Sequence, residues 1–311
     1  MKNQPAIGAV DIGGTKIAVG VVTPQGRILG RAECPTDAQR GPSDAVQRIA
    51  ALLRQTAAQA GAKLEGIGIG ATGPVHPLTG EFGNVEFLPG WEGFKLIRAL
   101  EQELGLPAAI ENDADAAALG EAAWGAGKGA ARFAYVTVST GIGVGLVFDG
   151  QLYRGVDGSH PEIGHMTLDP SGPQCSCGAR GCWESLASGT GISRAWREAT
   201  GQEAEARLVF AAAEAGDPRA LAVVNSGVGY LGLGLANLVT MLVPEVIAIG
   251  GGVMRGRHLF WERLQANILK NCGYVPAARV RLAPAGLGED TSLAGAASVW
   301  LHHQSRLTPR G

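Results

Sequence analysis

Residues 6–22, AIGAVDIGGTKIAVGVV, decide the fold that we expect for this chain. The apolar run at residues 6–10 predicts a buried strand, and residues 17–22 predict a second one. Between them, residues 11–16 form a turn made of an acid, two glycines, a hydroxyl and a cation. A third strand at residues 27–33 completes a predicted antiparallel meander.

The same strand–turn–strand pattern returns in the middle of the chain. Residues 133–138 and 144–148 predict two strands, and a polar, glycine-rich turn at residues 139–143 joins them. Helical and strand segments follow each copy, so the sequence predicts two α/β lobes around a cleft. In such sheets, ligands bind at the carboxyl ends of the strands.

Apolar periodicity and end signals predict the other elements. The expected strands are residues 67–70, 108–110, 246–249 and 279–283. The expected helices are residues 44–60, with Ser43 as N-cap, and 94–104, 114–124, 203–215, 218–242, 258–270 and 291–303. We place the smaller lobe at residues 1–115 plus 291–311 and the larger lobe at residues 116–290.

The composition limits the possible classes of protein. Hydrophobic residues make up 46% of the 311 residues and aromatic residues 5%, which predicts an aliphatic core. The net charge of −2 offers no basic surface for nucleic acid. The apolar run at residues 230–243 is too short and too interrupted for a bilayer, so we expect a buried helix and no membrane partner. The N-terminus has no secretory signal pattern, and we expect a cytoplasmic protein.

The first glycine-rich turn predicts a phosphate-binding loop. Gly13 and Gly14 would let backbone amides approach a phosphate, and Thr15 and Lys16 would add side-chain donors. Asp11 could hold Mg²⁺ through water. A plain hairpin turn is the competing interpretation, because the Walker A spacing is absent.

Two later glycine motifs extend this hypothesis. Residues 139–143, STGIG, would be a second phosphate loop that echoes the first one. Residues 250–252, three consecutive glycines after a strand, would let a nucleotide base or ribose approach the backbone. An ordinary hairpin and an ordinary strand-to-helix turn are the alternatives.

Glu111-Asn112-Asp113 ends a strand at the predicted cleft. An aspartate at this position can accept a hydroxyl proton during phosphoryl transfer. Asn112 can bond to sugar hydroxyls through both its oxygen and its NH₂ group. Asp113 as the N-cap of the helix at residues 114–124 is a compatible structural interpretation.

Three of the five cysteines lie in residues 162–184, EIGHMTLDPSGPQCSCGARGCWE. A tetrahedral structural zinc site needs four ligands, and the segment offers His165, Cys175, Cys177 and Cys182. A metal-free cluster of reduced thiols is the alternative. The loop would present Glu162 and Glu184 to hydroxyl groups, although Glu162 could also be a surface salt-bridge partner.

Together, the motifs DIGGTK, END, STGIG, E-x-G-H, C-x-C-G-x₂-G-C-x-E and IGGGV resemble the ROK family (repressors, open reading frames and kinases). The resemblance covers essentially the whole chain. It implies an actin-like ATPase fold with two ribonuclease-H-like lobes, a central cleft and a zinc-stapled loop. It also implies transfer of the ATP γ-phosphoryl group to a hexose, in a homodimer or homotetramer.

The resemblance also assigns roles to individual residues. Asp113 becomes the catalytic base, and the other sugar ligands are Gly73, Asn84, Asn112, Glu162, His165 and Glu184. The residues implied to hold phosphates and Mg²⁺ are Asp11, Gly13, Gly14, Thr15, Lys16, Thr140 and Gly141. Gly251 and Gly252 would lie near the adenosine. His165 would serve both the zinc ion and the sugar.

We therefore expect a glucokinase-type enzyme that uses ATP, Mg²⁺ and structural Zn²⁺ to phosphorylate glucose at O6. His160-Pro161, ahead of Glu162, resembles the fructokinase branch of the family. A fructokinase, a mannokinase or an N-acetyl-amino-sugar kinase thus stays open as an alternative. A sugar-responsive repressor is the remaining one, but those members carry an N-terminal winged-helix domain, which we do not expect here.

Overall fold

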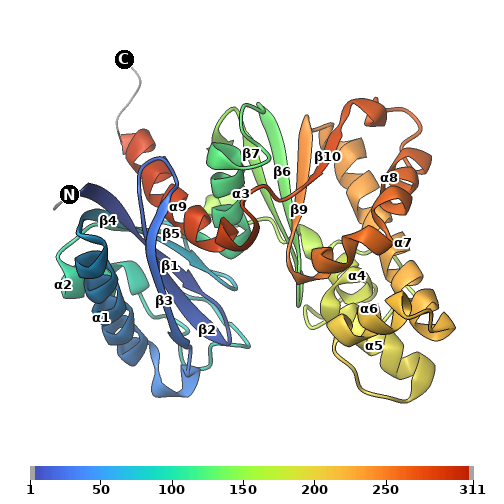
Figure 1. Ribbon diagram of the computed structural model, residues 1–311, viewed down its shortest axis with the longest axis horizontal. Coiled ribbons are helices and arrows are strands. Elements are labelled where there is room, and N and C mark those ends of the chain that lie inside the picture. Colours follow the sequence, from blue (N-terminus) through green and yellow to red (C-terminus); the bar gives the residue numbers. More distant parts are fainter. Residues whose placement is uncertain (1–3, 308–311) are drawn as a thin grey trace. The chain divides into compact units, whose positions relative to one another are not determined.

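Figure 1 shows the computed structural model, which describes residues 4–307. These residues form two compact units. The first takes in the described residues up to Gly129, together with Gly145–Pro161 and the described residues from Ala285 onward. The second consists of Ala130–Val144 and Glu162–Pro284. The predicted lobes overlap these units in large part but divide the chain differently, and they stay a prediction; their residues 1–3 and 308–311 lie outside the described part.

The first sheet has five strands in the order β3-β2-β1-β4-β5. Its strands are β1 (Gln4–Ile12), β2 (Lys16–Val22), β3 (Ile28–Pro35), β4 (Ala62–Ala71) and β5 (Ala108–Asn112). The predicted meander is confirmed, because β1, β2 and β3 pair antiparallel. Strands β4 and β5 extend the sheet in parallel with β1, which requires crossover connections.

Helices α1 (Pro42–Ala60) and α2 (Leu96–Leu104) supply these crossovers. Ile49 and Leu53 of α1 are fully buried in the core of this sheet. The N-cap of α1 is Gly41, so the prediction of Ser43 was wrong. Pro42 occupies the first helical position, where its missing N–H costs nothing and its fixed φ suits the helix.

Helices α3 (Asp113–Trp124) and α9 (Thr291–Leu307) pack against each other in the first unit. A Cβ atom at Gly120 would lie only 2.8 Å from the Cα atom of Gly295, so the two backbones approach closely. The α9 backbone is equally close to the sheet, since a Cβ at Gly68 would lie 1.9 Å from the carbonyl oxygen of Ala296. The glycines at these positions permit this approach, because they have no Cβ atom.

The second sheet repeats the order of the first, as β10-β9-β6-β7-β8. Its strands are β6 (Arg132–Val138), β7 (Ile142–Phe148), β8 (Gln151–Leu152), β9 (Val246–Gly250) and β10 (Arg281–Pro284). The two orders are identical when the second is read from its other end, so that β6 matches β1, β7 matches β2, β8 matches β3, β9 matches β4 and β10 matches β5. The internal repetition predicted from the strand–turn–strand pattern is therefore confirmed.

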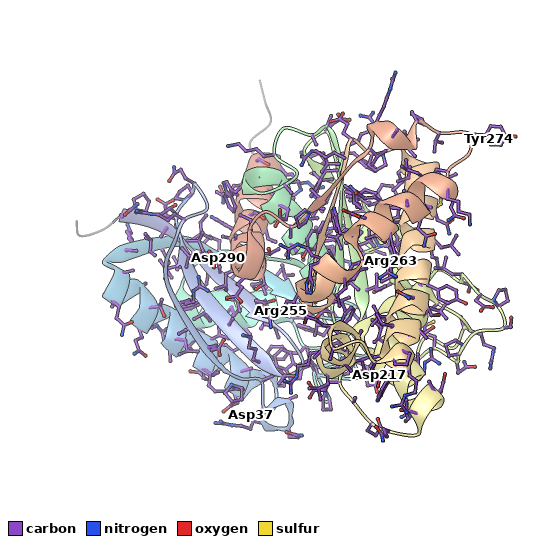
Figure 2. The ribbon with its side chains drawn as sticks, turned by 45° about the vertical axis from the view of Figure 1, so that its right-hand side comes forward. Asp37, Asp217, Arg255, Arg263, Tyr274 and Asp290 are labelled. Atoms are coloured by element: carbon purple, nitrogen blue, oxygen red, sulfur yellow. The ribbon has the colours of Figure 1, made fainter. Side chains whose placement is uncertain are left out.

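The helices of the second unit surround α7 (Pro218–Leu242). They are α4 (Trp183–Ala187), α5 (Gly189–Thr200), α6 (Ala206–Glu214) and α8 (Trp261–Lys270). The bounds of α7 match the prediction, because Asp217, labelled in Figure 2, caps it ahead of Pro218. Within the described residues, α7 alone is long and apolar enough to cross a membrane, but 61% of its most apolar window is buried, as in a core helix.

Candidate functional site

The candidate base, Asp113, begins α3 directly after β5. The N-cap is Asn112, whose side-chain oxygen accepts from the backbone N–H of Ala114 at 2.9 Å. The sequence had placed the cap one residue later, at Asp113. The Asp113 carboxylate accepts from the same N–H at 2.8 Å, and this bond orients it at the positive end of the helix.

The environment of Asp113 favours its neutral form more than water would. Its side chain reaches solvent, yet protein surrounds the carboxyl group, and the nearby Asp11 carboxylate repels its charge. Burial and Asp11 together raise the pKa of Asp113 to about 7. Burial also raises the pKa of Asp11, which a hydrogen bond from Ser292 and the charge of Lys16 partly offset. A carboxylate with a pKa near neutrality suits general base catalysis.

A buried charge network lies beside this residue, and the sequence interpretation missed most of it. Asp115 is fully buried, and its Oδ2 atom bonds to Arg154 at 2.5 Å and to His160 Nδ1 at 2.6 Å. Arg154 also forms an ion pair with Glu111. Burial raises the pKa of Glu111 to about 7, against the opposing charge of Arg154. The available signal was an acid, Asp115, inside an otherwise apolar run of residues 114–119.

The first turn, residues 13–15 between β1 and β2, is closed by backbone and side-chain bonds. Gly13 N–H donates to the Lys16 carbonyl at 3.0 Å, and the Thr36 hydroxyl donates to the Gly13 carbonyl at 2.6 Å. Thr36 N–H donates to the Thr15 carbonyl at 2.9 Å. The Lys16 ammonium pairs with Glu33 at 2.8 Å on the surface, so a phosphate would have to compete for it.

Two predicted sugar ligands, Gly73 and Asn84, belong to one loop of the first unit. Gly73 has a left-handed backbone with φ of 81°, and a Cβ atom there would lie 2.7 Å from Val85. Val85 is buried, whereas the neighbouring Asn84 is exposed. The loop therefore brings Gly73 next to the segment that carries Asn84. Their roles stay predictions.

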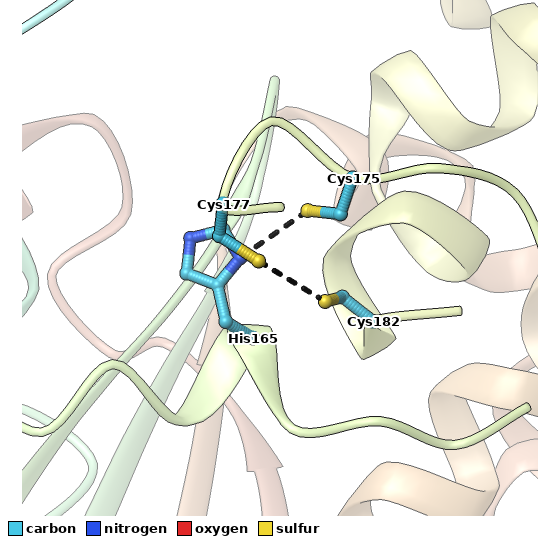
Figure 3. A group of neighbouring side chains, drawn as sticks. All are labelled: His165, Cys175, Cys177 and Cys182. Carbon is cyan, nitrogen blue, oxygen red and sulfur yellow. Dashed lines mark hydrogen bonds between the residues drawn. The ribbon is translucent and has the colours of Figure 1, made fainter. Parts of the chain in front are cut away.

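The predicted metal ligands come together in the second unit (Figure 3). The ligand atoms of His165, Cys175, Cys177 and Cys182 all lie within 4.8 Å of one another. His165 Nδ1 is 3.4 Å from Cys175 Sγ, and the sulfurs of Cys177 and Cys182 are 3.5 Å apart. Ligands bound tetrahedrally to zinc at about 2.0–2.3 Å would have separations close to these. The donor set and its spacing thus fit a zinc ion.

The thiols also show why a cation would stabilise this cluster. Burial and the neighbouring sulfurs raise the pKa of Cys182 to about 12, whereas the backbone N–H of Ala179 lowers the pKa of Cys177. A divalent cation would favour the thiolate form of every cysteine in the cluster. All four ligands come from the protein, so the metal would be structural.

The second turn, residues 139–141 between β6 and β7, borders a cavity of about 570 Å³ in the second unit. Helices α5 and α6 and the 3-10 segment Gly252–Leu259 complete its walls. Thr140 and Gly252 line it, as does Arg255, which Figure 2 labels. The volume is in the range of small-molecule sites. Gly251, with φ of 93°, turns the chain into this wall.

Glu162 and Glu184 lie at the two ends of residues 162–184, which we call the metal loop. Glu162 is exposed, and its carbonyl accepts from the backbone N–H of His165 at 3.0 Å. Glu184 is half-buried, and its Oε2 atom accepts from the backbone N–H of Ile142 at 2.9 Å. The sequence had not predicted the bond between Glu184 and Ile142. The sugar-binding roles of both carboxylates stay predictions.

Comparison with known proteins agrees with these features. The glucokinase of Halalkalibacterium halodurans is 40% identical over 264 residues, which is 79% of this chain and 80% of that protein. The ROK hexokinase structure from Thermus thermophilus has a TM-score of 0.87 and 37% identity, over 96% of this chain and 99% of its own. A ROK glucokinase from Streptomyces griseus, solved with glucose and AMPPNP, has a TM-score of 0.79 and 32% identity, over 94% and 98%.

Relatives with other activities match as well. The N-acetylmannosamine kinase of Citrobacter koseri is 35% identical over 93% of this chain and 96% of its own length. The xylose repressor of Bacillus subtilis is 31% identical over 77% of this chain and 62% of its own length. The model of the ROK family matches residues 7–303. This chain belongs to the ROK family.

Proposed function

We propose that this protein is an ATP-dependent sugar kinase of glucokinase type, which phosphorylates glucose at O6. The observation that carries the proposal is Asp113, a carboxylate held at the start of α3 with a pKa of about 7. In phosphoryl transfer, such a group takes the proton of the attacking hydroxyl. Similarity to a glucokinase solved with glucose and AMPPNP supports the choice of sugar and donor.

The chain offers a residue for each other task. Asn112, Glu162, His165 and Glu184, with Gly73 and Asn84, would orient the sugar hydroxyls. Asp11 and the first turn, from Gly13 to Lys16, would hold phosphate oxygens and Mg²⁺, and Thr140 and Gly141 would contact phosphate from the second turn. The cavity beside Gly252 has a suitable volume for a nucleoside, which favours ATP over polyphosphate. Bound Mg²⁺ would neutralise the charge that develops on the transferred group.

The test is a panel of hexoses with ATP-Mg²⁺, read as relative kcat/KM. We expect glucose to lead. A lead for fructose, mannose or an N-acetyl-amino sugar would keep the enzyme class and change the substrate, because one or two hydroxyl contacts separate these sugars. Sequence-specific retention of DNA without any phosphorylation would favour a repressor instead.

The base is tested with Asp113→Asn. The amide keeps the hydrogen-bond acceptor for Ala114 but cannot take a proton, so kcat should fall about 10²- to 10⁴-fold. Asp37→Asn is the matched control, because Asp37 is exposed and its φ of 46° suits asparagine. Full activity in Asp113→Asn would contradict the proposed base.

We further propose a cytoplasmic homodimer or homotetramer. Light scattering of the purified protein measures the assembly, and fractionation of cells measures the location.

A further inference from the structure

Two segments contact the backbone of Ile142, the residue that directly follows the second turn. Glu184 accepts a hydrogen bond from its N–H at 2.9 Å. Gly164 lies against its carbonyl so closely that a Cβ atom there would be 2.0 Å from the oxygen. Gly164 and Glu184 lie near the two ends of the metal loop, 20 positions apart in the sequence.

The segment after Glu184 continues along the same turn. Gly189 N–H donates to the Ser139 carbonyl at 2.7 Å, and Thr190 N–H donates to the Thr140 carbonyl at 3.3 Å. The Thr190 hydroxyl bonds to that same carbonyl. Residues 184–190 therefore contact the second turn and its following residue at Ser139, Thr140 and Ile142, in addition to the bond of 2.9 Å from Ser139 N–H to the Gly141 carbonyl inside the turn.

The two segments that contact Ile142 also carry the predicted metal ligands, whose ligand atoms lie within 4.8 Å of one another. His165 directly follows Gly164, and Cys182 is the N-cap of α4, two residues before Glu184. A backbone bond of 2.9 Å from Trp183 to Met166 adds a further tie. A metal ion held by both segments would thus fix the distance between the two contacts on Ile142.

We propose that Glu184, together with a metal ion held by His165, Cys175, Cys177 and Cys182, fixes the position of the second turn and therefore of the donor phosphates. This inference rests on the proposed kinase function for the identity of the ligand. Only Oε2 of Glu184 bonds to Ile142, so Oε1 can still accept from a sugar hydroxyl. Glu184 is then a positioning residue that contacts both the proposed sugar and the second turn.

The first experiment measures the turn without any catalysis. Hydrogen–deuterium exchange of residues 139–143 is followed by mass spectrometry in the wild type, Glu184→Ala and Glu184→Gln. Loss of the acceptor in Glu184→Ala should speed exchange about tenfold or more, whereas Glu184→Gln keeps an oxygen acceptor and should retain most protection. Affinity for a non-hydrolysable ATP analogue with Mg²⁺, measured without sugar, should fall about tenfold in Glu184→Ala.

A double-mutant cycle isolates the contact. A Cβ atom at Gly141 would lie 2.2 Å from Glu184 Oε2, while the Gly141 backbone lies outside the left-handed region and tolerates alanine. Gly141→Ala should therefore weaken analogue binding strongly in the wild type and little in the Glu184→Ala background. Additive effects would overturn the proposal.

The metal is tested with Cys177→Ser, with Cys34→Ser as control because Cys34 lies in β3 of the first unit. Loss of zinc, measured by elemental analysis, should speed exchange at residues 139–143 as well as in the metal loop. Faster exchange in the metal loop alone would overturn the proposal. So would a Glu184→Ala protein that loses sugar phosphorylation but keeps wild-type exchange and analogue affinity. If the wild type phosphorylates no sugar, the kinase proposal fails, while the exchange data still decide this one.

Discussion

The two halves of the chain share one strand order, yet their opening turns are held in different ways. The first turn is held by the strands that flank it and by Thr36, which is 23 positions from Gly13. The second turn has its own bond from Ser139 N–H to the Gly141 carbonyl, and it is also held by Glu184, Gly189 and Thr190, which lie 42 to 50 positions away. Two copies of one fold can thus share a strand order while one opening turn is held by nearby contacts and the other is also held by a segment 42 to 50 positions away.

The largest expected effect breaks the second turn and leaves the first intact. Cys182→Ser removes a buried, predicted metal ligand at the start of α4, and loss of a structural metal is among the few causes of destabilisation above ~4 kcal/mol. We expect a much lower melting temperature, no bound zinc and rapid exchange at residues 139–143. Wild-type protection at residues 13–16 under mild conditions would confirm that the two turns are independent.

The next effect concerns the support that Asp11, near the end of β1, receives from α9. Glu121 is fully buried and accepts from the backbone N–H groups of Ala126, Gly286 and Leu287 at 2.8, 2.8 and 2.9 Å. Glu121→Ala leaves these donors without their acceptor, which should cost about 3 kcal/mol or more of unfolding free energy. It should also loosen Ser292, the hydrogen-bond partner of Asp11.

Urea unfolding measures this change. The matched control is Glu198→Ala, which removes an exposed carboxylate paired with Arg194 and should cost less than about 0.5 kcal/mol. Equal effects in both variants would mean that α9 is not held through Glu121.

The next expected effect is a dependence of stability on pH that arises from Asp113 at the start of α3. The folded state raises the pKa of Asp113 to about 7, so it favours the protonated form. This favourable contribution is complete below the unfolded pKa of about 3.9 and is lost as the pH rises through about 7. Asp113→Asn should therefore be more stable than the wild type at pH 8 and lose this advantage near pH 4. Melting temperatures across this range measure the effect, and a gain that is equal at both pH values would contradict it.

The smallest expected effect removes one local bond of the first turn. Thr36→Val deletes the hydroxyl that bonds to the Gly13 carbonyl and nearly preserves the side-chain shape, at a cost of about 1 kcal/mol. Exchange at residues 13–16 should rise, and exchange at residues 139–143 should stay unchanged. Thr23→Val is the matched control, because Thr23 is also buried but accepts from Arg27 at the following turn.

Features that depend on local contacts, like those of the first turn, could be predicted from the sequence. Strands such as β1 and β9 are continuous apolar runs, and α7 has an Asp-Pro start, so local signals were sufficient. Helices α4 and α5 were missed, because residues 187–191, ASGTG, have the composition of a loop. Ser188 caps α5 there by accepting from the Gly191 N–H.

In the candidate site, too, local patterns could be predicted and contacts between distant residues could not. The four predicted metal ligands have a characteristic spacing within a short segment, and this spacing predicted that their side chains would cluster. The bond between Asp115 and His160 joins residues 45 positions apart, and the bond between Glu184 and Ile142 joins residues 42 positions apart. Only the folded chain brings such pairs together, so no local pattern could have predicted them.

The close packing of α9 against α3 and the first sheet also bears on the order in which the chain folds during synthesis. The first unit contains the earliest residues to leave the ribosome, but its sheet stays without α9 until residues 291–307 have been made. Residues 162–284, which make up most of the second unit, precede α9 and can fold before it emerges. The first unit is therefore the first to begin synthesis and the last to be completed.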